Sequence, residues 1–145
     1  MKGLRRLDPI INLHRLRRRV LKQLVASLKA QGAELAGRLE GLGREGMRVR
    51  AWNSESLSRG ENADRRRLAE AWMACAERES GDLRRRICEL AVQIQESEKR
   101  LVRASQELKM LSTLQDRRAA REREQAAKRE QRDLDEMASH CAGMP

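Results

Sequence analysis

Few side chains in this 145-residue sequence are of the types that carry out catalysis or hold a metal ion. Cys75 and Cys88 would lie about 20 Å apart along one helix, which is too far for a disulfide. The three cysteines, including Cys141, form no CxxC motif, and His14 and His140 are far apart in the sequence, so a metal site is not expected. The sequence also has no phosphate-binding GxxxxGK[ST] loop, no HExxH and no GxSxG. We therefore expect reduced cysteines, no metal, no cofactor and no enzymatic activity.

The charged side chains are the more informative chemistry. The sequence carries 32 Lys and Arg against 22 Asp and Glu, a net charge of +10. Most of this excess falls in residues 1–50, with 13 basic against 4 acidic residues. Such a block can bind an acidic protein surface, nucleic acid or an anionic membrane, or it can simply be a solvated helix face. No apolar run reaches the 18 to 20 residues of a membrane span and there is no signal-peptide core, so we expect a cytoplasmic protein without membrane insertion.

The composition indicates which elements must position these charges. Charged residues make up 37% of the chain, Phe and Tyr are absent, and Trp52 and Trp72 are the only aromatic residues. A globular core usually depends on aromatic side chains. The two prolines, Pro9 and Pro145, lie near the two ends, so no proline interrupts a helix between them. This composition is typical of a coiled coil.

Apolar residues repeat at alternating steps of four and three in two segments, which is the heptad pattern of left-handed coiled coils. We call these two sets the seams. They comprise Leu21, Val25, Leu28, Gly32, Leu35, Leu39, Leu42, Gly46 and Val49, and then Met73, Ala76, Ser80, Leu83, Ile87, Leu90, Ile94, Ser97, Leu101, Ala104, Leu108 and Leu111.

The polar stretch between the seams contains Gly60 and several helix-capping residue types, and is the natural turn. We therefore predict an all-α fold: an antiparallel two-helix coiled-coil hairpin with a longer C-terminal helix. It forms a single domain over residues 1–145, with helix 1 at about 9–52, a turn at about 53–62 and helix 2 at about 63–138. The charged stretch 115–136 reads as a single helix supported by surface pairs such as Glu124–Lys128.

The register of the hairpin has two solutions. One places Leu28 opposite Ile87 and puts the polar residues Arg18 and Ser97 in one layer. A slip of one heptad also matches seam to seam but separates Arg18 from Ser97. We favour the first register.

Five glycines crowd residues 32–46, and each costs about 1 kcal/mol relative to alanine inside a helix. This favours a first helix that frays early, with a loop from near Gly41. The alternative is a soft segment near the turn that adapts to a partner.

Two segments carry a resemblance to a known family. The stretch LHRLRRRVLKQLVASLKAQ is similar to a basic opening helix, and EKRLVRASQELKMLSTLQDRRAAREREQAAKREQRDLDEMA is similar to a C-terminal run with an LQxR-like stretch, a charged helix and a D/E-x-x-A ending. Together with a short first helix followed by a longer one, they resemble the FliJ/YscO family, central-stalk proteins of bacterial type III export ATPases. The opening helix favours the injectisome branch, whose members serve virulence.

The resemblance implies a hairpin that inserts its two termini into the pore of a hexameric ATPase, promotes assembly and activity of the ring, and sits at the cytoplasmic base of the secretion apparatus. Its tip would reach the cytoplasmic ring of the export gate, and secretion chaperones would be further partners. The expected ATPase-binding residues are Arg15, Arg17, Arg18, Arg19, Arg117, Arg118, Arg121 and Arg123. The expected tip residues are Leu42, Met47, Trp52, Leu68 and Trp72, although packing across the hairpin is the favoured role for Trp72.

Two other functions remain open from the sequence. A structural coiled-coil scaffold would self-associate without a ring-shaped partner. A nucleic-acid-binding protein would use the basic helix, but no aromatic residue lies near that block to stack on a base, so nucleic acid is not an expected partner.

Overall fold

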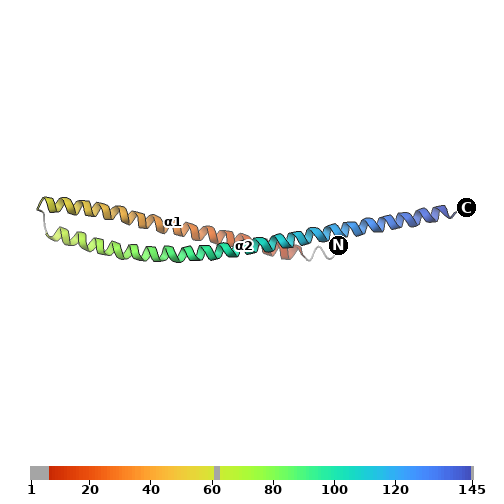
Figure 1. The fold of residues 1–145 in the computed structure, drawn as a ribbon, viewed down its shortest axis with the longest axis horizontal. Helices are drawn as coiled ribbons and strands as arrows, with labels where there is room; N and C mark the ends of the chain where they lie inside the picture. The colour runs from red at the N-terminus through yellow and green to blue at the C-terminus, as the bar shows by residue number, and fades with distance from the viewer. Residues whose placement is uncertain (1–6, 61–62, 145) are drawn as a thin grey trace. The chain divides into compact units, whose positions relative to one another are not determined.

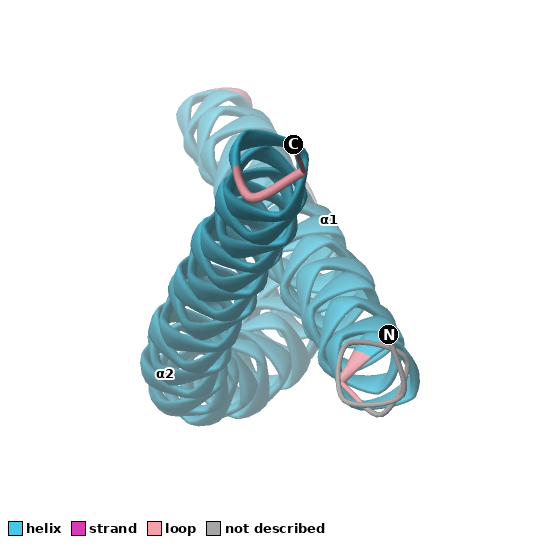
Figure 2. Cartoon of the chain, turned by 90° about the vertical axis from the view of Figure 1, so that its right-hand side faces the viewer, coloured by secondary structure: helices cyan, strands magenta, loops and turns pink. Residues whose placement is uncertain are grey.

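The computed structural model describes residues 7–60 and 63–144. These residues form two long helices, α1 (Asp8–Ser58) and α2 (Ala63–Ala142), which run antiparallel and pack against each other (Figure 1). No strand occurs in the described ranges (Figure 2). The all-α hairpin with a longer second helix is confirmed. No helix in the described part of the chain is long and apolar enough to cross a membrane.

The helix ends follow local sequence signals. Asp8 lies in the first turn of α1, where a negative charge interacts favourably with the helix dipole. Pro9 follows it, in the first turn, where backbone N–H groups have no acceptor within the helix, so proline loses no hydrogen bond there. At the other end, Gly60 adopts a φ of 71°, the left-handed conformation that commonly ends a helix. The hydroxyl of Ser58 donates a hydrogen bond of 2.7 Å to the carbonyl of Glu55 and satisfies one of the last acceptors.

The first helix is longer than predicted. It continues through Ser58 instead of ending near Trp52, and the glycine-rich segment 32–46 lies entirely within it. The expected loop near Gly41 is therefore wrong. The polar residues Asn53, Ser54 and Ser56 extend the helix because nothing in them prevents it sterically, and the stop comes only at Gly60.

Packing divides the chain into two parts. The terminal part comprises residues 1–20 with 101–145, and the turn part comprises residues 21–100. Leu7, Ile11 and Leu108 form the buried core of the terminal part, with Leu111 packed against it. In the turn part the buried positions include Val25, Ala69 and Leu83.

The two seams are confirmed, since every residue assigned to them is buried or half-buried. The favoured register, however, is wrong. It placed Leu101 opposite His14 and Arg86 opposite Lys29, but His14 lies 3.5 Å from Glu107 and Lys29 pairs with Glu98 at 2.8 Å.

The other contacts between α1 and α2 are displaced in the same direction, toward the C-terminus of α2, but by different amounts. Arg38, for example, pairs with Glu79 at 3.3 Å, two residues beyond its expected partner. Gly46 lies beside Trp72, and Gln115 donates a hydrogen bond to Asp8. The register that fits these contacts is the one slipped by about one heptad. The physical reason is the later turn, because extending α1 to Ser58 moves the midpoint of the hairpin along the chain.

Candidate partner-binding surfaces

The expected ATPase-binding arginines all belong to the terminal part. Arg15 and Arg19 are exposed, and Arg15 donates a hydrogen bond of 3.5 Å to Asn12 on its own helix. Arg17 reaches across to α2, where its Nη1 lies 3.8 Å from Oε2 of Glu107. Arg18 is half-buried. The four arginines of α1 are thus not equivalent, because Arg17 contacts α2 and Arg18 is partly withdrawn from solvent.

The α2 arginines lie further toward the chain end. Gln115 is hydrogen-bonded to Asp8 in the first turn of α1, so Arg117, Arg118 and Arg121 come after the level of Asp8. Each of these side chains is exposed. Both arginine groups therefore belong to the terminal part. The α2 group lies further along α2 than the point where α1 begins, whereas the α1 group lies within the paired stretch.

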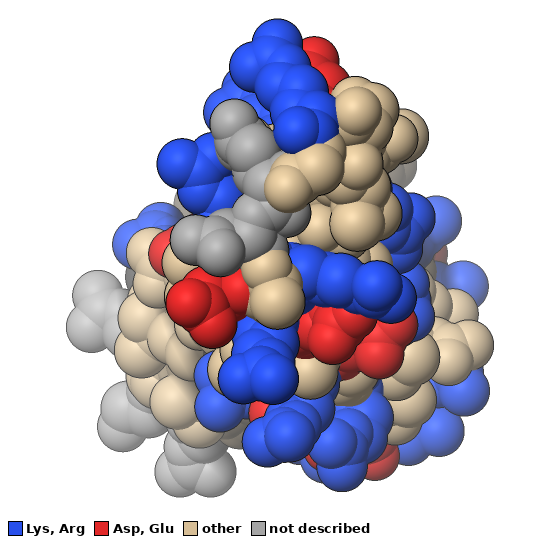
Figure 3. Space-filling view, turned by 90° about the vertical axis from the view of Figure 1, so that its left-hand side faces the viewer, with Lys and Arg blue, Asp and Glu red and all other residues tan. Residues whose placement is uncertain are grey.

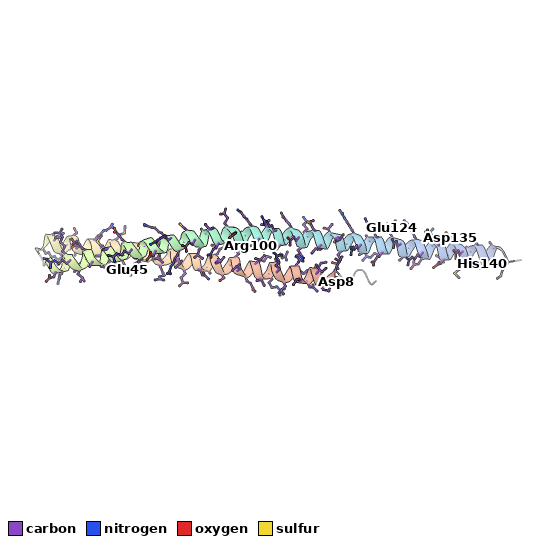
Figure 4. All side chains as sticks on the ribbon, turned by 90° about the horizontal axis from the view of Figure 1, so that it is seen from below. Asp8, Glu45, Arg100, Glu124, Asp135 and His140 are labelled. Carbon is purple, nitrogen blue, oxygen red and sulfur yellow. The ribbon has the colours of Figure 1, made fainter. Side chains whose placement is uncertain are left out.

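Beyond these arginines, α2 has no packing partner in the terminal part. Every described residue from 123 onward is exposed, and the labelled residues Glu124, Asp135 and His140 lie along α2 beyond Asp8 (Figure 4). The predicted pair is confirmed, with Lys128 Nζ 2.7 Å from Glu124 Oε1. Such pairs stabilise a helix surface by a few tenths of a kcal/mol each. This segment is a single charged helix.

The expected tip residues divide into two groups. Leu42, Met47 and Trp72 line one shallow hollow in the turn part, together with Gly46, and the Trp72 ring approaches a Cβ built on Gly46 to 3.9 Å. Packing of Trp72 across the hairpin is thus confirmed. Leu42 is half-buried, whereas Met47 is exposed.

Trp52 and Leu68 lie outside that hollow. Trp52 is 39% exposed, and the guanidinium of Arg65 lies 5.9 Å from the centre of its ring, within the range of a cation–π contact. Leu68 is exposed on α2. Seen from the side of the turn, acidic and uncharged side chains are interspersed among the lysines and arginines (Figure 3).

Leu57 was missed as a candidate, although it is exposed one residue before the end of α1. In the sequence, Leu57 can be recognised as an isolated aliphatic residue in the polar stretch before Gly60. Because that stretch was expected to be a turn, no helix face was assigned to it.

Metal-binding geometry is not found in the described ranges, where no group of three or more His, Cys, Asp or Glu could hold an ion. Cys75, Cys88 and Cys141 are free and exposed. The surfaces of this chain thus offer charge and exposed apolar side chains for binding other molecules.

Comparison with known families decides the identity. The family model of the flagellar FliJ protein matches residues 1–144. This chain belongs to the FliJ family. The resemblance expected from the sequence is therefore confirmed. No curated protein and no solved structure matches the chain.

The FliJ family consists of central-stalk proteins of type III secretion and flagellar export. It is a family of non-enzymatic accessory components, associated with the export ATPase and located at the cytoplasmic side of the export apparatus. This FliJ-family chain has the long paired helices that such a stalk requires.

Proposed function

We propose that this FliJ-family chain inserts its terminal part into the pore of a hexameric type III export ATPase, promotes assembly and activity of the ring, and links it to the export gate. The observation that carries the proposal is that both arginine groups belong to the terminal part, while Arg117, Arg118 and Arg121 are exposed on a helix segment past the start of α1. Residues 1–145 would act together as one stalk.

The exposed arginines of the terminal part are suited to interaction with an ATPase ring. Exposed arginines steer a partner of opposite charge and set its orientation, and they add less to affinity than buried apolar contacts do. An acidic lining of a ring would therefore attract and align the terminal part without clamping it. The α2 segment from residue 123 onward carries four basic against five acidic residues, so it adds no net positive charge to this surface.

The tip would contact the cytoplasmic ring of the export gate. Trp52 and Leu68 support this proposal because both are exposed near the turn, and Trp is enriched at interface hot spots. Leu42, Met47 and Trp72 form a second apolar surface, of which Met47 is the most exposed member. Secretion chaperones are further proposed partners.

The injectisome branch is proposed on the basic opening helix of residues 13–31. Deletion of the gene should abolish secretion of virulence effectors and leave swimming motility intact. Loss of motility with normal effector secretion would place the chain in flagellar export instead. Complementation with the intact gene is the control for effects on neighbouring genes.

A titration of the protein into the export ATPase of the same organism tests the central proposal. We expect ATP hydrolysis and hexamer formation to rise together and to saturate near one chain for six ATPase subunits. The rise should follow from stabilisation of the ring by a ligand that binds the assembled state. If neither quantity changes and the chain runs as a dimer or polymer by sedimentation, a structural scaffold becomes the better account.

Charge reversal provides the sharper test of the terminal part. The triple variant Arg117→Glu, Arg118→Glu and Arg121→Glu should weaken ATPase binding by about tenfold or more, with a reduced salt dependence, because it removes the steering charge. Binding is measured by anisotropy of the labelled protein at two salt concentrations.

The chain offers a matched control for this variant in the turn part. Arg84, Arg85 and Arg86 are likewise exposed on α2, so their reversal changes net charge equally. Equal loss of affinity in both triple variants would show that only net charge matters, and that the terminal part is not the binding end.

A further inference from the structure

The first helix carries a second apolar stripe that the seam does not use. Ile10, Leu13 and Val20 are exposed although they are large aliphatic residues, and Leu13 is 64% exposed. With Arg17, these residues are spaced by three, four and three positions. Residues at that spacing share one helix face, so they form a continuous stripe. Leu16 is exposed beside it.

The second helix has a corresponding stripe in the same part of the molecule. Met110 is 72% exposed and Leu114 is also exposed. They follow Glu107 by three and seven positions, so the three residues share a face of α2. Met110 and Leu114 also line one shallow hollow, together with Lys109 and Arg117.

An ion pair places the two stripes on the same side of the terminal part. Arg17 belongs to the α1 stripe and Glu107 to the α2 stripe, and their side chains meet at 3.8 Å. A pair across two packed helices can form only between flanks that lie on the same side of the seam. Ile10, Leu13, Val20, Met110 and Leu114 therefore border one face, which we call the apolar face.

We propose that the apolar face binds an acidic amphipathic helix of another protein as the third helix of a coiled coil. Two antiparallel helices with aliphatic residues along both borders of one side form a groove that a third apolar seam fills. The α1 stripe from Ile10 to Val20 extends over about 15 Å, which is enough for three turns of a partner helix.

Charge identifies the partner as acidic. Within residues 8–20 the only carboxylate is Asp8, against four arginines. On α2, Glu107 is already engaged by Arg17, whereas Lys109 and Arg117 border the hollow beside Met110 and Leu114. A second copy of this chain would bring the same basic segment against itself, which like-charge repulsion disfavours. The inference does not depend on the proposed function, because it requires only the face and its charge.

The test uses a synthetic peptide of three heptads with leucine at both seam positions and glutamate at the flanking positions. A reference peptide carries lysine in place of each glutamate. We expect the full-length protein to bind the glutamate peptide, by fluorescence anisotropy, at least about tenfold more tightly than the lysine peptide. Equal binding of the two peptides would overturn the acidic character of the partner.

Variants of the full-length protein test whether the peptide binds at the apolar face. The double variant Leu13→Glu and Met110→Glu should weaken binding of the glutamate peptide by at least about tenfold. Both side chains are exposed, so the hairpin should keep its helicity, which circular dichroism checks. The matched control is Leu134→Glu with Met137→Glu, two equally hydrophobic exposed positions on the charged end of α2, and it should bind as the wild type does.

Two results would overturn the proposal. One is unchanged binding by the Leu13 and Met110 variant. The other is self-association of the wild-type protein, measured by sedimentation equilibrium, that this variant abolishes, because it would make a second copy the occupant of the face.

Discussion

Replacing Gly37, Gly41 and Gly43 with alanine should raise the free energy of unfolding by about 3 kcal/mol, at about 1 kcal/mol for each residue. All three lie inside α1, and a Cβ added at any of them meets no atom within 4 Å. Alanine therefore removes backbone freedom from the unfolded chain without a clash in the folded one. Urea denaturation followed by helical circular dichroism measures the change.

Gly60 provides the opposite control. Its φ of 71° is a conformation that alanine adopts only with strain, so Gly60→Ala should lower stability by about 1 kcal/mol. If the triple alanine variant instead leaves stability unchanged, residues 37–43 are not helical in solution and the early fraying expected from the glycines is correct.

The same triple variant tests whether flexibility of the glycine-rich segment of α1 is needed for function. If the glycines only lower the stability of α1 and have no role in function, ATPase stimulation by the triple alanine variant should equal that of the wild type. Lower stimulation with higher stability would show that the soft segment is required, in line with the stability–activity trade-off seen where function needs flexibility.

A cysteine pair at Leu28 and Ile94 should form a disulfide within one chain, whereas the pair Leu28 and Ile87 should not. In the register shifted by one heptad, Leu28 and Ile94 occupy one layer. Ile87 is then displaced by seven residues, about 10 Å along α2, which exceeds the distance that a disulfide spans. Oxidation followed by non-reducing electrophoresis and mass spectrometry distinguishes the two pairs.

The native cysteines must first be replaced by serine, and their exposure makes this substitution mild. Faster bridging of Leu28 with Ile87 would restore the register that pairs Arg18 with Ser97. Bridging only between chains, for either pair, would show that the helices associate in a dimer instead of folding back as a monomeric hairpin.

The candidate surfaces were predictable to different degrees. The basic block of α1 was recognised from charge density alone, whereas Arg117, Arg118 and Arg121 were assigned only through the family resemblance. The apolar face was not found, because Leu13 and Met110 belong to different helices and only the ion pair between Arg17 and Glu107 relates them. Trp72 shows the converse, since packing across the hairpin was already its favoured role from the sequence.

The sequence by itself determined that this protein is a two-helix hairpin, which residues form its seams, and where its basic charge lies. These properties follow from local periodicity, which each segment carries independently. Only the tertiary structure decided the register and the end of α1. A slip of seven residues preserves the apolar match, so the choice depends on the turn at Gly60 and on the summed contacts between the helices, such as Lys29 with Glu98.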